Sequence, residues 1–366
     1  MKIVIDARES GTSTGRYIDK LVEHLHSLAP ADEIIVLTKP ARVKFLKSVA
    51  PNFKTVESDF SEFTFEEQVG FLKQLRALKA DLVHFGMTQQ PVRYRGPRVT
   101  TIHDLTTLRF NNPDKNIIVF KTKQLVYRRV IKNAARKSSH VIVPSNYVKD
   151  DVVKYTGINP DKVVVTYEAA DKISESPKQV DSLAGKKFIM YIGRPTPHKN
   201  LERLIEAFSI LKEEKPEMLL ALAGRTDANY ERIKHLVGKK NLSNSVVFTG
   251  FVTEGQLRWL YENTEAYIFP SLSEGFGLPG LEAMAQGAPV VSSNATCLPE
   301  IYGDAAHYFN PLDVEDMAAK ISEVIDDDDL RSKLVKNGQA QESKYSWDHM
   351  AKQTLEVYKS VLQQKT

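Results

Sequence analysis

The sequence is very poor in cysteine. Cys297 is the only one among 366 residues, which excludes an intrachain disulfide and a cysteine-based metal site. No base signature surrounds this thiol, so we expect a small buried residue rather than a nucleophile. A reducing compartment agrees with this composition.

Long apolar runs are lacking as well. No stretch approaches the roughly 20 apolar residues that span a bilayer. Met1-Lys-Ile-Val-Ile-Asp6 enters a predicted strand without the pattern of a secretion signal. We therefore expect a cytoplasmic protein, with peripheral contact to the inner face of the membrane as an alternative. A G-x-G-x-x-G fingerprint is missing after the first strand, which disfavours hydride chemistry, and no aromatic stacking series indicates nucleic-acid binding.

Two α/β halves are what the sequence contains. A length of 366 residues suggests two domains, and 42% hydrophobic with 26% charged residues is typical of a soluble globular enzyme. Short apolar strands alternate with helical patterns throughout, which predicts two Rossmann-like parallel sheets covered by helices. We expect a first domain over 1–171, a polar linker over 172–187, a second domain over 188–346, and a last helix over 347–366.

One stretch, Phe269–Ser293, is predicted as strand, glycine-rich turn, helix and strand. Gly275 and Gly277 are free to take a positive φ, Pro279 suits the first turn of a helix, and Gly287 suits its end. The exposed N–H groups and the dipole of such a helix start favour an anion such as a phosphate.

Two carboxylates flank this helix start. Glu274 precedes the helix and Glu282 lies about one turn inside it. Carboxylates accept hydroxyl hydrogens but repel phosphates, so a phosphate between two hydroxyl-rich groups, as in a nucleotide-sugar, would suit the site. An ordinary β–loop–α connection with two solvated glutamates explains the same spacing.

Other polar residues also follow predicted strands. Arg194 and Lys199 flank a proline-rich turn that could clamp a diphosphate, although two surface charges are the alternative. His103 and Asp104 follow a strand and could contact a sugar hydroxyl or serve as structural residues. Arg16 opens a helix over 16–28 that Ser13 or Thr14 could cap, and it could pair with an anion or remain solvated.

Two charged segments have ordinary explanations. The helix predicted over 116–137 has a basic side and an apolar side; packing against the core explains it, and attraction to anionic lipid or a phosphorylated acceptor is the alternative. The run Asp326–Asp329 lacks partner ligands at a recognisable spacing and is interpreted as a solvated turn.

Two glutamates eight positions apart frame the run Glu274-Gly-Phe-Gly-Leu-Pro-Gly-Leu-Glu282. Further motifs are Pro270-Ser-Leu-Ser-Glu274, Ala288-Pro-Val-Val-Ser-Ser-Asn294, Leu298-Pro-Glu-Ile-Tyr-Gly-Asp-Ala-Ala306, Tyr191-Ile-Gly-Arg194, Lys199-Asn200, Thr100-Thr-Ile-His-Asp-Leu105 and Ser346-Trp-Asp348. Together these motifs resemble the retaining GT-B glycosyltransferases with the E-x7-E signature, the glycosyl transferases group 1, and their mannosyltransferase branch in particular.

The resemblance implies two Rossmann-like domains that face each other across a cleft, with the donor in the second, the acceptor in the first, and a last helix that crosses back. It implies that Arg194 and Lys199 bind the donor diphosphate, that Glu274 holds donor-sugar hydroxyls, that Glu282 holds the ribose, and that His103 lies by the donor sugar. We count His103, Arg194, Lys199 and Glu274 as the catalytic candidates and Arg16 and Asp104 as acceptor-binding. The donor-binding candidates are Gly15, Gly193, Gly224, Phe251, Val252, Phe276, Gly277, Leu278 and Glu282.

The predicted function is retaining, metal-independent transfer of a hexose from a nucleotide-sugar, with no cofactor, to a saccharide or lipid-linked acceptor. GDP-mannose is the expected donor, because the Pro270–Pro279 run is most like the mannosyltransferase branch. UDP-glucose or another donor, a nucleotide-sugar epimerase and a non-catalytic nucleotide-sugar binder are the alternatives. Tyr167-Glu-Ala-Ala-Asp171 and Gly224-Arg-Thr-Asp227 depart from the usual family pattern, which leaves the local donor contacts open.

Overall fold

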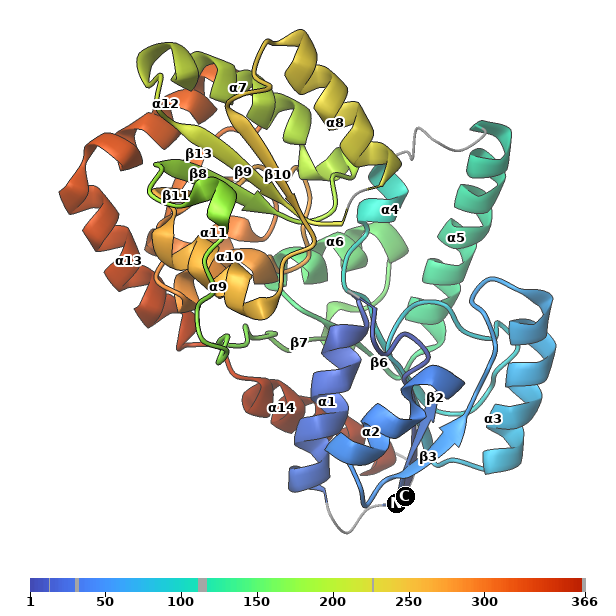
Figure 1. Cartoon of the computed structure of the whole chain (residues 1–366). Helices are drawn as coiled ribbons and strands as arrows, with labels where there is room; N and C mark the ends of the chain where they lie inside the picture. Colours follow the sequence, from blue (N-terminus) through green and yellow to red (C-terminus); the bar gives the residue numbers. More distant parts are fainter. Residues whose placement is uncertain (13, 30–32, 111–116, 226, 364–366) are drawn as a thin grey trace. The chain divides into compact units, whose positions relative to one another are not determined.

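The computed structural model describes the chain apart from residues 13, 30–32, 111–116, 226 and 364–366, and apart from the side chains of 117–123. The described chain divides into two compact units. Unit 1 takes in residues 1–109, 117–168 and 346–363, and unit 2 takes in residue 110 and residues 169–345. Figure 1 labels many of the helices and strands of both units.

Unit 1 is built on a seven-stranded parallel sheet with the order β3-β2-β1-β4-β5-β6-β7. Its strands are β1 (Lys2–Asp6), β2 (Glu33–Thr38), β3 (Lys54–Glu57), β4 (Leu82–Phe85), β5 (Arg98–Thr101), β6 (His140–Val143) and β7 (Val163–Val165). Its helices are α1 (Gly15–Leu28), α2 (Val43–Val49), α3 (Leu72–Leu78), α4 (Thr106–Arg109), α5 (Ile117–Lys137), α6 (Asn146–Thr156) and α14 (Trp347–Gln363). Short helical turns lie at η1 (Pro40–Arg42), η2 (Glu67–Phe71) and η3 (Pro160–Lys162), of which η2 is a π-helix.

The last helix, α14, belongs to unit 1, as predicted for the chain's return to its first half. Apolar residues along α14 are buried, and the helix packs against α1, β4 and β6. His84 on β4 lies 2.5 Å from the Tyr358 hydroxyl through its Nδ1 atom and 2.8 Å from the Thr101 hydroxyl through its Nε2 atom. Burial lowers the pKa of His84 to about 3, so this imidazole is neutral inside the core.

Unit 2 is built on a six-stranded parallel sheet with the order β10-β9-β8-β11-β12-β13. Its strands are β8 (Phe188–Ile192), β9 (Leu219–Ala223), β10 (Val246–Gly250), β11 (Ala266–Phe269), β12 (Val290–Ser293) and β13 (Ala306–Phe309). Its helices are α7 (Leu201–Glu214), α8 (Ala228–Lys239), α9 (Glu254–Asn263), α10 (Leu278–Ala285), α11 (Leu298–Tyr302), α12 (Val314–Asp326) and α13 (Asp328–Glu342). Short turns lie at η4 (Asp181–Leu183), η5 (Pro197–Lys199) and η6 (Gly303–Ala305).

The cores explain why these segments fold as they do. The strands β8 and β9 and the inner faces of α7, α8 and α12 bury one continuous apolar cluster in unit 2. In unit 1 one cluster centres on β1, β2, β4 and α3, and another on β6, α5 and α6. Strands covered on both faces are apolar almost throughout, which is the pattern of a buried parallel sheet. Both predicted parallel sheets are confirmed.

Local signals succeeded in part. Pro279 lies in the first turn of α10 and Gly287 follows that helix with φ +79°, as predicted. Gly277 has φ +93°, whereas Gly275 is not among the described glycines with positive φ. The predicted cap of α1 is wrong for Thr14, whose side chain makes no capping hydrogen bond; Thr12 Oγ1 accepts the Gly15 N–H instead at 3.0 Å. Ser13, the other predicted cap, lies outside the described residues.

The basic helix is α5, and its predicted first residue and the side chains before 124 lie outside the description. Farther along, Leu125 and Val126 are about half exposed, at 51% and 48%, beside the exposed Arg128 and Arg129. Ile131 and Ala135 on the same helix are buried in the core. Core packing of one side is therefore confirmed, and membrane contact through the other side stays a prediction. Among the described helices, none is both long and apolar enough to cross a bilayer.

Candidate active site

In unit 2, the loops after neighbouring strands meet at the carboxyl edge of the sheet. The Gly193 N–H donates to Ala223 O at 3.0 Å, and the Gly224 N–H donates to Gly250 O at 3.0 Å. Gly224 has φ +147°, and a Cβ atom there would lie 2.7 Å from Gly193 O. The loops therefore approach too closely for side chains and present backbone at this edge.

Lys199 and Glu274 form an ion pair at the same edge. Lys199 ends the turn η5 after β8, and Glu274 lies in the loop between β11 and α10. Their Nζ and Oε1 atoms are 2.6 Å apart, and the side chains are only 19% and 13% exposed. The Lys199 ammonium also lies 5.4 Å from the centre of the Phe269 ring. A cation and a carboxylate from two loops are thus held together in a partly desolvated position.

Asn200 joins these two loops to the loop that follows β13. Its Nδ2 donates to Pro270 O at 3.0 Å and to Pro311 O at 2.8 Å, and the side chain is buried. Its backbone is left-handed, with φ +61°, a conformation that asparagine tolerates better than most residues. The sequence motif contains Asn200, but its role in joining three loops depends on residues 70 and 111 positions away and could not be read locally.

Hydrogen bonds with the side chains of Thr296 and Tyr302 hold the loop before α10 and the start of that helix. The Glu274 N–H donates to Thr296 Oγ1 at 3.1 Å, and the Tyr302 hydroxyl donates to Gly277 O at 2.5 Å. A Cβ atom on Gly277 would lie 2.5 Å from that hydroxyl oxygen. Phe276 is buried, whereas Leu278 and the half-buried Glu282 follow on the helix. Cys297 is fully buried, as predicted, and burial raises the pKa of its thiol.

Arg194 has a different partner from Lys199. Its Nε lies 2.7 Å from Oδ2 of Asp227, the residue that caps α8, and the Arg194 side chain is 72% exposed. Burial would raise the pKa of Asp227, but the hydrogen bond from Arg194 outweighs it and lowers that pKa. Phe251 is 71% exposed, with the Arg225 guanidinium 5.9 Å from its ring, and Val252 follows it. Arg194 and Phe251 thus lie in loops of the same edge with their side chains accessible.

In unit 1, the predicted helix start is tightly packed. A Cβ atom on Gly15 would lie 1.7 Å from Glu9 O, so only glycine fits at the first residue of α1. Arg16 follows and is half-buried. The close backbone approach is determined by the preceding loop, which folds back over the helix start.

His103 uses both ring nitrogens within unit 1. Its Nδ1 lies 3.3 Å from Glu168 Oε1, and its Nε2 lies 3.1 Å from Gly86 O. Burial lowers the pKa of His103, but the hydrogen bond and the charge of Glu168 outweigh it, and that pKa is raised. Asp104 Oδ1 accepts the N–H of Thr106, the first residue of α4, at 2.7 Å. Glu168 belongs to the segment that departs from the family pattern, and sequence reasoning did not identify it as a partner of His103.

A pocket of about 350 Å³ lies beside His103 in unit 1. It is lined by Glu9, Thr14, Glu62, Phe63, Met87, Thr88, Gln89, Thr101, His103, Asp104, Thr107 and Tyr127. Of the acceptor-site candidates, Asp104 is among the lining residues and Arg16 is not.

Two glutamates that sequence reasoning missed, Glu9 and Glu62, lie next to each other in the lining of this pocket. Burial raises the pKa of the Glu9 carboxyl, and its hydrogen bond with Glu62 raises it further. Burial acts in the same direction on Glu62, but hydrogen bonds from its own backbone and from Lys39, 3.0 Å away, hold the pKa of Glu62 below its ordinary value. Together with hydroxyls, an amide and an imidazole, the pair makes a wall rich in hydrogen-bonding groups.

Comparison with known proteins agrees with this architecture. Residues 172–341 match the family Glycosyl transferases group 1, and residues 14–172 match Glycosyltransferase Family 4. O-antigen chain mannosyltransferase B of Escherichia coli is 30% identical over 270 residues, which cover 71% of this chain and 70% of that protein. The chain belongs to the group 1 glycosyltransferases.

Other relatives and solved structures agree. O-antigen chain mannosyltransferase RfbU of Salmonella typhimurium is 25% identical over 86% of this chain and 88% of its own length. Serotype-specific mannosyltransferase WbdA of Escherichia coli is 35% identical over 240 residues, but the match spans only 29% of that longer protein. Sucrose-phosphate synthase from Thermosynechococcus elongatus superposes with a TM-score of 0.77, 19% identity and 98% coverage of both chains. Anabaena HepE in complex with UDP-glucose gives a TM-score of 0.75 at 19% identity, covering 98% of this chain and all of HepE. The fold is GT-B.

In this group 1 glycosyltransferase, the predicted residues form two sets, one in each unit. The set in unit 2 lies at one edge of the sheet and consists of Gly193, Lys199, Gly224, Glu274 and Gly277. The set in unit 1 lies by the pocket and consists of His103 and Asp104. Among the described residues, no group of three or more His, Cys, Asp or Glu side chains is arranged to hold a metal ion.

Proposed function

We propose that this glycosyltransferase moves a mannosyl group from GDP-mannose to a saccharide hydroxyl, on a free or lipid-linked acceptor, with retention at the anomeric carbon and without a metal ion. The Lys199–Glu274 pair at the start of α10 is the observation that carries the proposal. It sets a phosphate-binding cation beside a hydroxyl-binding carboxylate, as a nucleotide-sugar requires. Relatives named as mannosyltransferases, at 25–35% identity, support the choice of sugar.

The donor diphosphate would lie between Lys199 and the backbone N–H groups of Gly277 and Leu278 at the start of α10. Backbone N–H groups at a helix start attract phosphate oxygens, although Pro279 has none and the Gly280 N–H donates to Gly277 O at 3.1 Å. Arg194, mostly exposed, would leave Asp227 to reach the same phosphates. Glu274 would accept hydroxyl hydrogens of the donor sugar, and Glu282 those of the ribose. Phe251, 71% exposed at the same edge, would contact the nucleoside.

Transfer would proceed on one face of the sugar. The bond from C1 to the phosphate oxygen breaks while the bond from C1 to the acceptor oxygen forms, and the acceptor proton passes to the leaving diphosphate. Lys199 and the helix start stabilise the negative charge that develops on that leaving group, which is the role a metal ion has in other transferases. The pocket of unit 1 would bind the acceptor, because its carboxylates, hydroxyls and imidazole can all hydrogen-bond to sugar hydroxyls.

The test measures donor binding and transfer on the full chain. Wild-type protein should bind GDP-mannose in calorimetry and transfer its sugar, whereas Lys199→Ala and Glu274→Ala should each lose at least about a hundredfold in kcat/KM. Lys215→Ala is the control, because Lys215 pairs with Asp326 at the end of α12. Wild-type rates in either site variant would contradict the proposed donor site. Binding of UDP-glucose in place of GDP-mannose would contradict the proposed donor. A product with inverted anomeric configuration, or a loss of rate in EDTA, would contradict retaining, metal-independent transfer.

A further inference from the structure

Phe63 stands out in unit 1 as an exposed aromatic residue in an unfavourable backbone conformation. It is 55% exposed, and its φ is +62°, in the left-handed region that a bulky L-residue rarely adopts. Such a conformation persists only where the surroundings impose it, and such positions gather at binding sites. Phe63 also lines the pocket described above, where its ring centre lies 5.8 Å from that of Tyr127, at an angle of 66°.

Glu67 imposes this conformation. Its Oε2 accepts the Phe63 N–H at 3.0 Å, and its Oε1 accepts from Arg8 Nη2 at 3.0 Å. Glu67 is 1% exposed, in the turn η2 that follows the loop. A carboxylate held at both oxygens cannot follow Phe63 if the loop relaxes, so the strain at Phe63 is retained.

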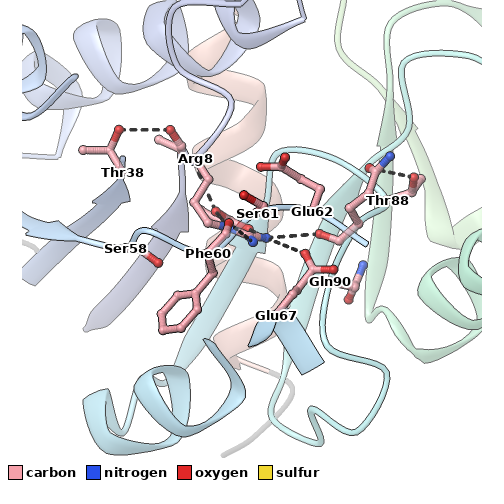
Figure 2. Close-up of polar contacts among 12 residues, drawn as sticks. Arg8, Thr38, Ser58, Phe60, Ser61, Glu62, Glu67, Thr88 and Gln90 are labelled. Atoms are coloured by element: carbon pink, nitrogen blue, oxygen red, sulfur yellow. Dashed lines mark hydrogen bonds and ion pairs between the residues drawn. The ribbon is translucent and has the colours of Figure 1, made fainter. Parts of the chain in front are cut away.

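Arg8 binds the Glu67 carboxylate and two backbone carbonyls near the pocket. Its guanidinium pairs with Asp6 through two bonds of 2.8 Å. Its Nη1 donates to Phe60 O at 3.1 Å. Its Nη2 also reaches Gln89 O at 3.4 Å. Phe60 lies shortly before the lining residues Glu62 and Phe63 in the chain, and Gln89 is itself a lining residue. Figure 2 shows the side chain of Arg8 extending toward Phe60 and Glu67.

The hydrogen bonds of Arg8 depend on its positive charge, which is retained in the core. Arg8 is 2% exposed and lies 3.8 Å from the centre of the Phe71 ring. Burial would lower its pKa, but Asp6 and Glu67 outweigh that effect and raise it, so the guanidinium is always charged. Only arginine has enough donors in one plane to bind two carboxylates and two carbonyls together, and lysine would leave several of these acceptors unpaired.

We propose that Phe63 is the platform on which a neutral sugar ring stacks in the unit 1 pocket, and that Arg8 and Glu67 are positioning residues that hold it there. The apolar face of a pyranose covers an exposed aromatic ring, while Glu9 and Glu62 beside it accept the hydroxyl hydrogens at the edge of the sugar. The same carboxylates repel an anionic sugar. The inference rests on the proposed function, since it assigns the sugar that this pocket takes.

The test uses methyl α-D-mannopyranoside, the glucoside, the galactoside and mannose 6-phosphate as probes of the full-length protein. Saturation-transfer NMR, without donor, should detect at least one neutral pyranoside and give a dissociation constant that Phe63→Ala and Phe63→Gly both raise at least about fivefold. Glycine takes φ +62° without strain, so Phe63→Gly should unfold at a higher temperature than Phe63→Ala. Equal losses of sugar binding in two variants of unequal stability separate the stacking role from a structural one.

Matched controls exist in the same unit. Phe65→Ala removes a more exposed ring, at 77%, that does not line the pocket, and it should change nothing. Arg8→Lys should weaken sugar binding, whereas Arg98→Lys should not, because Arg98 is equally buried but bonds to Gln90 and Tyr94, outside the lining residues. Phe63→Trp should retain binding.

Donor binding to the same variants separates the two proposals. If wild-type protein fails to bind any nucleotide-sugar in calorimetry, the proposed function is wrong. If it binds the donor but none of the three neutral pyranosides receives saturation, the inference about Phe63 is wrong. Equal binding by wild type and Phe63→Ala, or tighter binding of mannose 6-phosphate than of the neutral sugars, also overturns it.

Discussion

Replacing Lys199 with methionine tests whether the ion pair at the start of α10 is a built part of the fold. Methionine preserves most of the apolar stem but leaves the Glu274 carboxylate without the cation that lies 2.6 Å from it. A fully buried pair loses about 3–5 kcal/mol when one partner is removed, and an exposed pair about 0–1. With side chains 19% and 13% exposed, we expect unit 2 to lose about 2 kcal/mol, or about 4–8 °C in Tm.

The two tryptophans allow the units to be followed separately. Trp259 lies in α9 of unit 2 and Trp347 in α14 of unit 1, so fluorescence in a Trp347→Phe background reports the urea unfolding of unit 2. The double variant Lys199→Met/Glu274→Gln should recover most of the lost free energy, because no uncompensated charge remains.

The same urea titration, through the unfolding free energy of unit 2, can refute this reasoning. A loss below about 0.5 kcal/mol in Lys199→Met would show that the carboxylate is adequately solvated and that the pair does not preorganise the site. A double variant as unstable as Lys199→Met would show that lost packing, rather than an unpaired charge, explains the effect. Saturating GDP-mannose should stabilise wild type by about 2.7 kcal/mol at a hundredfold excess over Kd and stabilise neither variant to that extent.

Two further predictions concern backbone and charge. Gly277→Ala should lower the free energy of urea unfolding by about 3 kcal/mol and abolish donor binding in calorimetry, because the new Cβ would lie 2.5 Å from the Tyr302 hydroxyl and the residue has φ +93°. The control is Gly238→Ala in α8, where no atom lies within 4 Å of the new Cβ and no loss of stability is expected. Equal losses of unfolding free energy in the two variants would contradict the steric explanation. Glu168→Gln removes the partner that raises the pKa of His103 above its ordinary value of 6.5. The stability that this shift contributes is full below that value and is lost as pH rises through the folded pKa. The advantage of wild type in thermal unfolding should therefore shrink as pH rises above 6.5, and an advantage independent of pH would show that His103 is not the group involved.

Much of the fold follows from local sequence because its strands are buried on both faces. Phe188–Ile192 and Leu219–Ala223 are continuous apolar runs bounded by turn residues, and each forms a central strand. The edge strand Lys54–Glu57 has no such apolar run, because half of its residues are exposed. The sequence pattern therefore does not predict a strand there. The short helix Val43–Val49, with a single buried residue, was missed for the same reason.

The candidate site divides along similar lines. The part in unit 2 is carried by a continuous motif, and residues such as Glu274 and Gly277 could be named because the loop and helix that hold them are adjacent in sequence. The pocket of unit 1 is assembled from residues as far apart as Glu9, Glu62 and Tyr127. No periodicity connects these positions. A buried arginine such as Arg8 also contradicts the ordinary preference of that residue for the surface, so its role becomes visible only when its partners are known.

Strain in the described chain is concentrated beside the proposed ligand sites. Five residues other than glycine have a left-handed backbone: Phe63, Lys79, Asn200, Asn241 and Thr296. Lys79 and Asn241 follow the ends of α3 and α8, where such a residue ordinarily terminates a helix.

The other three occur in loops and are each tied to a side-chain hydrogen bond near a proposed contact. Asn200 adjoins Lys199 and binds two carbonyls, Thr296 accepts the Glu274 N–H, and Phe63 donates its N–H to Glu67. A left-handed residue costs about 1–2 kcal/mol, so three of them would be removed by relaxation unless rigid partners opposed it. The cost is therefore best explained as preorganisation: the loops are held in the conformation that binds donor or acceptor before either arrives, which reduces the ordering entropy lost on binding.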